Sequence, residues 1–205
     1  MPDDQKQKQL QMVWPESRLK SPPEVTMPAG YALRTFQTGD APQYFKLMDS
    51  AGFKNWDNET LKPWLAKALP KGFFIMTESA SGEIVATAMA THNPTDLHPF
   101  GGELGWLAAS SEHAGKGLGL AVCAAVTRCF IQAGYRRIYL RTDDRRLAAI
   151  KVYLKLGYTP FLFAPDMKER WRRVCEKLKW PFIPDDWSVG SLSGLIGEGF
   201  ITINH

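Results

Sequence analysis

The stretch AGKGLG at residues 114–119 lies between a strand-like segment, residues 103–108, and a long apolar segment with a helical pattern, residues 118–133. Its glycines permit positive φ and let a ligand approach the backbone closely. The first N–H groups of a helix have no partner within the helix and carry partial positive charge, so they favour an anion. The stretch therefore predicts a binding turn whose geometry suits a diphosphate.

Three other interpretations of this turn are a nucleotide P-loop, a Rossmann turn and a plain turn. A nucleotide P-loop needs Ser or Thr directly after its lysine, whereas Gly117 follows Lys116. A Rossmann turn needs GxGxxG and an acidic residue at the end of the next strand, whereas the third glycine is displaced and that strand ends in Arg141. The sequence disfavours both, while a plain turn with glycines kept for packing stays open.

Composition is typical of one globular domain, with 205 residues, 44% of them hydrophobic and 22% charged. The formal net charge of +4 does not require a nucleic-acid partner and suits an anionic ligand equally well. The three cysteines form no CxxC pair, so neither a disulfide framework nor a metal site is predicted. Because the sequence shows no secretory signal and no apolar run long enough to span a membrane, we expect a cytoplasmic protein without membrane contact.

Hydrophobic periodicity divides the rest of the chain into alternating elements. Strands are expected at residues 31–36, 73–77, 84–91, 103–108, 137–141 and 158–163, and helices at 40–48, 59–69, 118–133, 147–156 and 166–178. Helices separate only some of the strands, so we expect an α/β fold with one mixed sheet. Residues 1–28, rich in Gln, Lys and Pro, are expected to form a loose arm that Trp14 attaches to the body. The core would then span 29–165, and 166–205 would form a C-terminal helix and tail.

Two linked motifs resemble the GNAT superfamily of N-acyltransferases. The family carries (Gln/Arg)-x-x-Gly-x-(Gly/Ala) between a strand and a helix, which residues 114–119 match except at the first position. Downstream, AIKVYLKLGY at residues 149–158 is similar to the family's Ala-Ile-x-x-Tyr-x-x-x-Gly-(Phe/Tyr) signature. The resemblance covers roughly residues 31–163, and Gly102-Glu103 with the preceding loop look similar to the mycothiol synthase branch.

This resemblance implies a single-domain fold with a mixed, mostly antiparallel sheet flanked by helices. It also implies an N-acetyltransferase that passes the acetyl group of acetyl-CoA to a small-molecule or peptide amine by direct attack. No nucleic acid, membrane or metal would take part, and a homodimer is compatible with it. The alternative within the same fold is a non-catalytic sensor that binds acyl-CoA.

Carried over position by position, the resemblance assigns roles to particular residues. Tyr153 would assist the leaving thiol, and Glu103 would act as the general base. The residues expected to bind the co-substrate are Leu107, Ala108, Ala109, Ala114, Gly115, Lys116, Gly117, Leu118, Gly119 and Arg146. Ala114 departs from the usual Gln or Arg and loses a side-chain contact to phosphate, for which Lys116 and Arg146 would compensate by charge.

Other polar residues offer weaker alternatives. His92 and His98 precede the strand that carries Glu103 and are further candidates for the base, because an amine must lose a proton before it attacks a thioester. The arginines between residues 136 and 146 are expected to form a solvated face, from which one would contact the 3′-phosphate of CoA. Trp56, Trp64 and Trp106 are expected in the core, although one of them would line the acceptor cleft.

Overall fold

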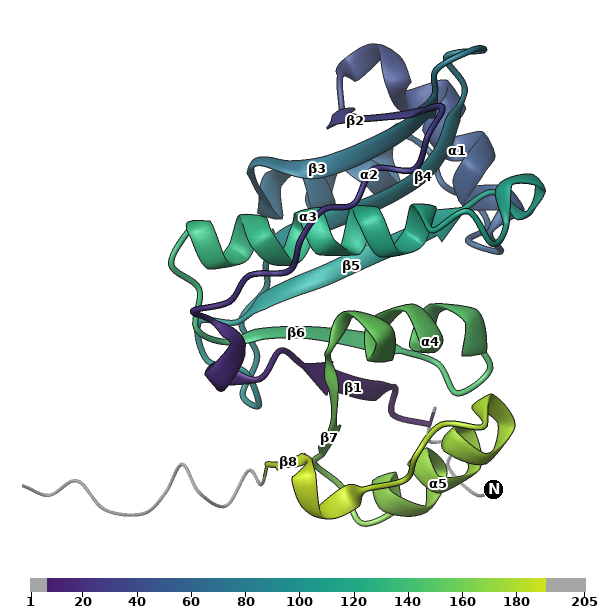
Figure 1. Cartoon of the computed structure of the whole chain (residues 1–205). Helices are drawn as coiled ribbons and strands as arrows, with labels where there is room; N and C mark the ends of the chain where they lie inside the picture. The colour runs from purple at the N-terminus through teal and green to yellow at the C-terminus, as the bar shows by residue number, and fades with distance from the viewer. Residues whose placement is uncertain (1–6, 191–205) are drawn as a thin grey trace, which may run out of the picture.

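The computed structural model describes residues 7–190, which form one mixed sheet with helices on both faces (Figure 1). The sheet has eight strands in the order β2-β3-β4-β5-β6-β1-β7-β8. Their bounds are β1 Leu10–Val13, β2 Tyr31–Thr35, β3 Ala68–Glu78, β4 Ile84–His92, β5 Gly102–Ala109, β6 Ile138–Thr142, β7 Thr159–Leu162 and β8 Ser188–Val189. Only the pairs β5–β6 and β7–β8 are parallel. The predicted α/β fold with a mixed, mostly antiparallel sheet is confirmed.

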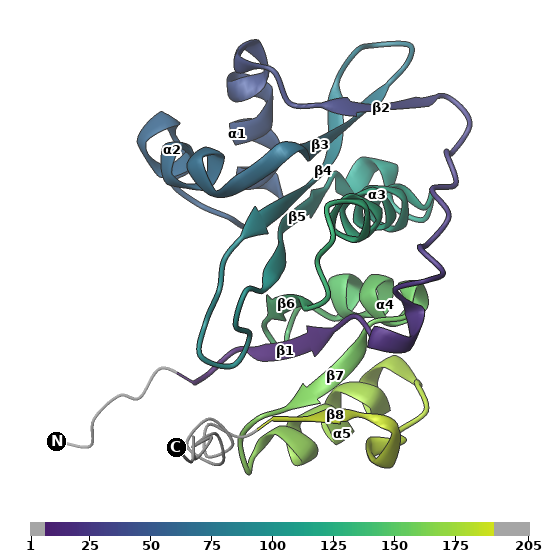
Figure 2. The same ribbon diagram turned by 90° about the vertical axis from the view of Figure 1, so that its left-hand side faces the viewer.

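The helices divide between the two faces of the sheet, as the turned view shows (Figure 2). Their bounds are α1 Ala41–Ser50, α2 Asn58–Lys67, α3 Leu118–Gln132, α4 Leu147–Leu156 and α5 Met167–Leu178. Helices α3, α4 and α5 bury their apolar residues in the larger core cluster, whereas α1 and α2 cover a smaller one on the opposite face. The first and last residues of each helix lie within two residues of the bounds predicted from the hydrophobic periodicity.

The prediction of a loose arm over residues 1–28 is wrong for residues 10–14, while residues 1–6 lie outside the described part of the chain. Residues 10–13 form β1, which pairs antiparallel with β6 on one side and with β7 on the other. Leu10 and Met12 are fully buried, and Trp14 packs edge-on against Tyr158. Four residues in a polar context are too short for period-two alternation to stand out, and the partners that stabilise β1 lie more than 120 residues away.

The C-terminal region continues the same sheet. Helix α5 matches the predicted helix at 166–178 and packs against β7. Strand β8 then pairs in parallel with β7 and extends the edge of the sheet. The part of the predicted tail from 191 to 205 lies outside the described residues. Among residues 7–190, no helix combines the length and hydropathy needed to cross a bilayer.

We expect Leu10→Ala to destabilise the protein by about 2–5 kcal/mol, because it leaves a cavity beneath the middle of the sheet. The free energy of unfolding from urea titration measures this loss. Lys8→Ala, at an exposed position just before β1, is the matched control and should change stability by less than about 0.5 kcal/mol. Equal stability of the two variants would contradict the burial of Leu10 and support a loose N-terminal arm.

Candidate active site

Strands β5 and β6 pair only at one end. Their parallel ladder holds Gly102 opposite Ile138 and Glu103 opposite Tyr139, and no pairing between the two strands follows (Figure 1). On the other edge of β5, the register with β4 shifts between Thr87 and Met89. Trp106 lies at this bulge with a φ of 56°, which is unusual for a residue with a side chain. Because β6 pairs with β5 only at Gly102 and Glu103, the main-chain groups of β5 that face β6 beyond this point are available to a ligand.

The predicted glycine turn follows β5 and begins α3. Gly115 and Gly117 have φ of 78° and 82°, in the left-handed region that favours glycine. A Cβ added at either position would meet nothing within 4 Å, so neighbouring side chains do not dictate these glycines. The first bond of the α3 ladder runs from Ala121 N–H to the carbonyl of Gly117. The preceding N–H groups of the turn therefore remain for an external acceptor.

A cavity of about 900 Å³ extends from this turn along α4. It is lined by nine of the ten residues predicted to bind the co-substrate, namely Leu107, Ala108, Ala109, Ala114, Gly115, Gly117, Leu118, Gly119 and Arg146. We call this cavity the long groove. Its walls come from the end of α1, β5, the turn and α4, so elements separated along the chain form one surface.

The long groove is positively charged. Arg145, Arg146, Lys151 and Lys155 line it, and no Asp or Glu is among its lining residues. Lys151 and Lys155 lie one turn apart on α4 and therefore on the same face of that helix. A groove that combines main-chain N–H groups with cations and lacks carboxylates suits a ligand that carries several phosphate charges.

Lys116 departs from its predicted role in the groove. Its ammonium donates to the Tyr31 hydroxyl at 2.8 Å and lies over the Tyr31 ring, outside the groove lining. The same hydroxyl lies 2.8 Å from Nδ1 of His113. Lys116 and His113 thus fasten the glycine turn to β2, while the predicted part of Lys116 in binding the co-substrate stays a prediction.

A second cavity of about 120 Å³ lies where β5 and β6 separate. It brings together both predicted catalytic residues, Glu103 and Tyr153, and it shares Leu107 and Arg146 with the long groove. We call it the reaction cavity. Burial holds the pKa of Tyr153 well above its ordinary value, so this hydroxyl keeps its proton at neutral pH.

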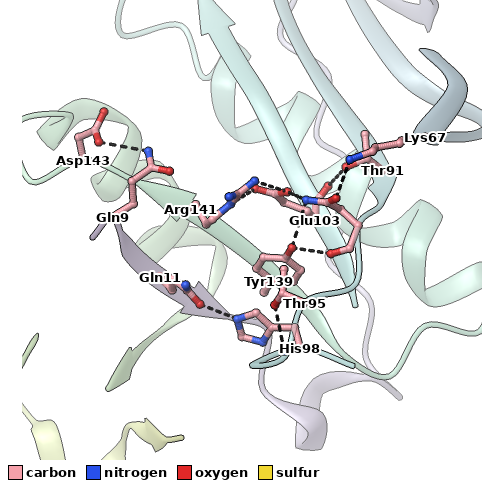
Figure 3. A network of polar contacts seen from close by, with 11 residues as sticks. Gln9, Gln11, Lys67, Thr91, Thr95, His98, Glu103, Tyr139, Arg141 and Asp143 are labelled. Carbon is pink, nitrogen blue, oxygen red and sulfur yellow. Dashed lines mark hydrogen bonds and ion pairs between the residues drawn. The ribbon is translucent and has the colours of Figure 1, made fainter. Parts of the chain in front are cut away.

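Glu103 lies at the centre of a polar network (Figure 3). Arg141 donates to both of its oxygens, at 2.7 and 3.0 Å, and the side-chain amide of Asn93 donates to Oε2 at 2.5 Å. The hydroxyl of Tyr139 donates to the carbonyl of Asn93, and Lys67 donates to the Asn93 side chain. These contacts fix the orientation of the Glu103 side chain and hold Arg141 at the cavity wall.

Asp143 is a second carboxylate in the reaction cavity that sequence reasoning missed. One of its oxygens accepts a hydrogen bond of 3.1 Å from Gln9, and the other lies 3.8 Å from Nε of Arg146. In Figure 3 the pair Gln9–Asp143 lies apart from the Glu103 network. Gln9 reaches this place because β1 runs beside β6, which no local pattern near residue 9 could indicate.

The loop histidines lie away from the reaction cavity. His98 is fully buried and stacks on Tyr139. Its Nε2 is hydrogen-bonded to the side-chain oxygen of Gln11, and its Nδ1 accepts a hydrogen bond from Arg137. Burial, together with the nearby Arg137 and Arg141 charges, lowers the pKa of His98 to about 3. His92 lies 2.8 Å from the Tyr135 hydroxyl. Neither histidine lines the reaction cavity, whereas Glu103 does.

The arginines between 136 and 146 do not form the continuous solvated face that the sequence suggests. Arg136 pairs with Glu16, Arg141 with Glu103, and Arg137 is half-buried over the Phe161 ring. Only Arg145 and Arg146 of this group line the long groove.

Four aromatic rings form one wall near the reaction cavity. The ring of Trp106 packs edge-on against Phe53, Trp56 and Trp64, with centroids 4.6–5.5 Å apart. Trp64 and Trp106 line the reaction cavity while half-buried, so they border the site instead of lying in the core. Arg146 lies over the Phe53 ring at 3.9 Å and joins this wall to α4. Within residues 7–190, no cluster of metal-ligating side chains accompanies them.

Comparison with curated proteins gives relatives of low identity. The mycothiol acetyltransferase of Pseudarthrobacter chlorophenolicus is 26% identical over 145 residues, which are 67% of this chain and 45% of that protein. The mycothiol acetyltransferase of Saccharomonospora viridis is 29% identical over 159 residues, 71% of this chain and 48% of that protein. The chain thus spans about half the length of the curated relatives it matches.

Solved structures show the same fold. A GCN5-related N-acetyltransferase from Sphaerobacter thermophilus aligns with a TM-score of 0.58 at 21% identity, covering 75% of this chain and 49% of that one. A tandem GNAT protein from the clavulanic acid biosynthesis pathway also aligns at 0.58, with 15% identity over 76% of this chain and 51% of that one. The Acetyltransferase (GNAT) family matches residues 37–158, more than half of the sequence, and includes the turn, the split sheet and α4. The chain therefore belongs to the GNAT acetyltransferase family.

Proposed function

We propose that the protein is an N-acetyltransferase that uses acetyl-CoA and an amine acceptor. The observation that carries this proposal is the adjacency of two cavities: a cationic groove without Asp or Glu among its lining residues starts at the glycine turn, and a small cavity lined by Tyr153 shares Leu107 and Arg146 with it. The groove fits a long polyphosphorylated co-substrate, and the small cavity fits the reacting end.

The residues of the groove match the parts of CoA in order. The N–H groups of the glycine turn would hold the diphosphate, and each such charge-assisted hydrogen bond contributes about 1.5–3 kcal/mol. The unpaired edge of β5 at Leu107 and Ala109 would bind the pantetheine amides, as an added strand binds a sheet edge. The thioester would then reach the reaction cavity, where β5 and β6 separate.

The reaction requires a neutral amine and a leaving thiol. Near pH 7 only about 0.1% of an alkylamine is neutral, which corresponds to about 4 kcal/mol, so a carboxylate at the site would accelerate the reaction by accepting the proton. The amine nitrogen bonds to the thioester carbon, the carbon–sulfur bond breaks, and its electron pair stays on sulfur. Tyr153, kept protonated by burial, would donate a hydrogen bond to that sulfur.

Two carboxylates are available to accept the proton. The assignment of the base to Glu103 remains a sequence-based prediction, and its oxygens already accept three hydrogen bonds. Asp143 accepts one hydrogen bond, from Gln9, and lines the same cavity. We therefore assign the proton transfer to Asp143 and the orientation of Arg141 to Glu103.

The acceptor enters from the side of the sheet that carries these carboxylates. A cavity of about 120 Å³ accommodates only the amine and the few atoms next to it, with the rest of the acceptor outside. Two curated relatives are named mycothiol acetyltransferase, which is compatible with a small-molecule amine here as well.

Acetyl-CoA should raise the melting temperature of the wild-type protein, because a ligand that binds only the folded state stabilises it. Gly117→Trp should abolish this shift by filling the groove. Gly82→Trp is the matched control: it also replaces a glycine of positive φ in open space, but in the β3–β4 turn, and it should keep the shift. A shift that survives in Gly117→Trp contradicts the assignment of the turn.

Tyr153→Phe should lower kcat on the order of tenfold, with little change in the Kd of CoA, because the hydroxyl acts on the departing sulfur. Steady-state kinetics with a panel of primary amines, paired with calorimetry, measures both quantities. Equal rates remove Tyr153 from the mechanism. Binding without turnover under every amine indicates a non-catalytic acyl-CoA sensor.

The base is identified by the pH dependence of kcat/KM. Asp143→Asn should lose the decline in rate at acid pH, because an amide has no carboxylate to protonate. Glu103→Gln should keep that decline and lower the rate at all pH values, because Arg141 loses an ionised partner. The reverse pattern would establish Glu103 as the base.

A further inference from the structure

Thr142, the last residue of β6, has a hydroxyl whose hydrogen-bonding capacity is unused. The residue is 3% exposed, and its Oγ1 finds no partner among the described residues. The other four buried threonines each donate to a main-chain carbonyl: Thr77 to Ala32, Thr87 to Phe74, Thr91 to Glu103 and Thr127 to Cys123. A buried hydroxyl without a partner costs free energy, so its presence calls for an explanation.

The location of Thr142 offers an explanation for its unpaired hydroxyl. Thr142 lines the reaction cavity, together with Tyr153 and Asp143. Three other buried polar atoms also lack partners, on Trp14, Tyr44 and Trp171, but none of these residues lines either cavity. Among these four residues, Thr142 is thus the one that lines a cavity of the candidate site.

Strand register puts Thr142 on the same side of the sheet as Tyr153. Thr142 lies opposite Leu10, and Leu140 lies opposite Met12. Residues directly opposite each other, and residues two apart along a strand, share a face. Leu10, Met12 and Leu140 all belong to the core cluster that contains Tyr153. Arg141 alternates to the other face, where it meets Glu103.

We propose that the Thr142 hydroxyl is a second hydrogen-bond donor to the CoA sulfur, beside Tyr153. This proposal rests on the proposed function, since it needs the thioester to lie in the reaction cavity. As the carbon–sulfur bond breaks, the electron pair moves to sulfur, and both hydroxyls donate to it while keeping their own protons. The thiolate later takes a proton from water, and the proton of the attacking amine goes to the carboxylate.

Hydrogen bonds are well suited to stabilising the thiolate, because the charged side chains that line the reaction cavity balance one another. The charged groups lining the cavity are Glu103 from β5, Arg141 from β6, and Asp143 and Arg146 between β6 and α4. Two carboxylates and two guanidinium groups leave no net charge to stabilise a thiolate. Cys123 of α3, whose burial raises its pKa above the ordinary range, stays neutral beside Tyr153. Donors aimed at the sulfur are therefore the available means of lowering the pKa of bound CoA.

The test follows the thiolate of bound CoA directly and needs no acceptor. The ultraviolet absorbance of the thiolate is titrated against pH for CoA bound to wild type, Thr142→Val, Thr142→Ser and Tyr153→Phe. Valine keeps the shape of threonine without the donor, and serine keeps the donor. We expect the pKa of bound CoA to lie at least about one unit below its free value of about 8.5 in wild type. It should rise in Thr142→Val and Tyr153→Phe and stay low in Thr142→Ser.

The outcomes separate the proposals. A bound pKa that is unchanged by Thr142→Val, or not lowered in wild type, overturns the role of Thr142. A rise in both Thr142→Val and Thr142→Ser also overturns it, because the effect then reflects packing and not the hydroxyl. Calorimetry of the same samples reports CoA binding: if wild type binds no CoA, the proposed function itself fails, whatever the titration shows.

Discussion

The site depends on one interruption of a hydrogen-bond ladder. Strands β5 and β6 are held together only through Gly102 and Glu103, and the bulge at Trp106 turns β5 away from β6 beyond that point. A non-glycine residue at a φ of 56° persists only where its surroundings enforce it. The three rings that pack around Trp106 supply that enforcement. Because the ladder stops, main-chain groups and both cavities become accessible in the interior of the sheet.

The split also assigns different chemistry to the two faces of the sheet. The Glu103–Arg141 pair lies on one face, and Thr142 and Tyr153 lie on the other. In the proposed mechanism, the amine would arrive from the carboxylate side and the thiol would depart toward the hydroxyl side. Proton acceptance and stabilisation of the thiolate would then take place on different faces of the sheet.

Sequence reasoning succeeded where the signal is local. The glycine turn, α3 and α4 follow from residues close together in the chain. Nine of the ten residues predicted to bind the co-substrate line one groove, and their binding role stays a prediction. It failed where the determinant is long-range: β1 takes its place through partners far along the chain, and Gln9 reaches Asp143 only for that reason. Two side-chain contacts also depend on three-dimensional packing that the local sequence does not reveal. These are the ion pair between Arg141 and Glu103 and the hydrogen bond from Lys116 to Tyr31.

The position of β1 ties folding to chemistry. It is the only element that bridges β6 and β7, and it buries Leu10 and Met12 beneath the core that carries Tyr153. Its preceding residue, Gln9, orients Asp143, while Leu10 fixes the side of the sheet on which Thr142 lies. Loss of β1 would therefore leave α3 and the glycine turn with their local signals intact, yet it would remove the support of every group proposed to act on the proton or on the sulfur.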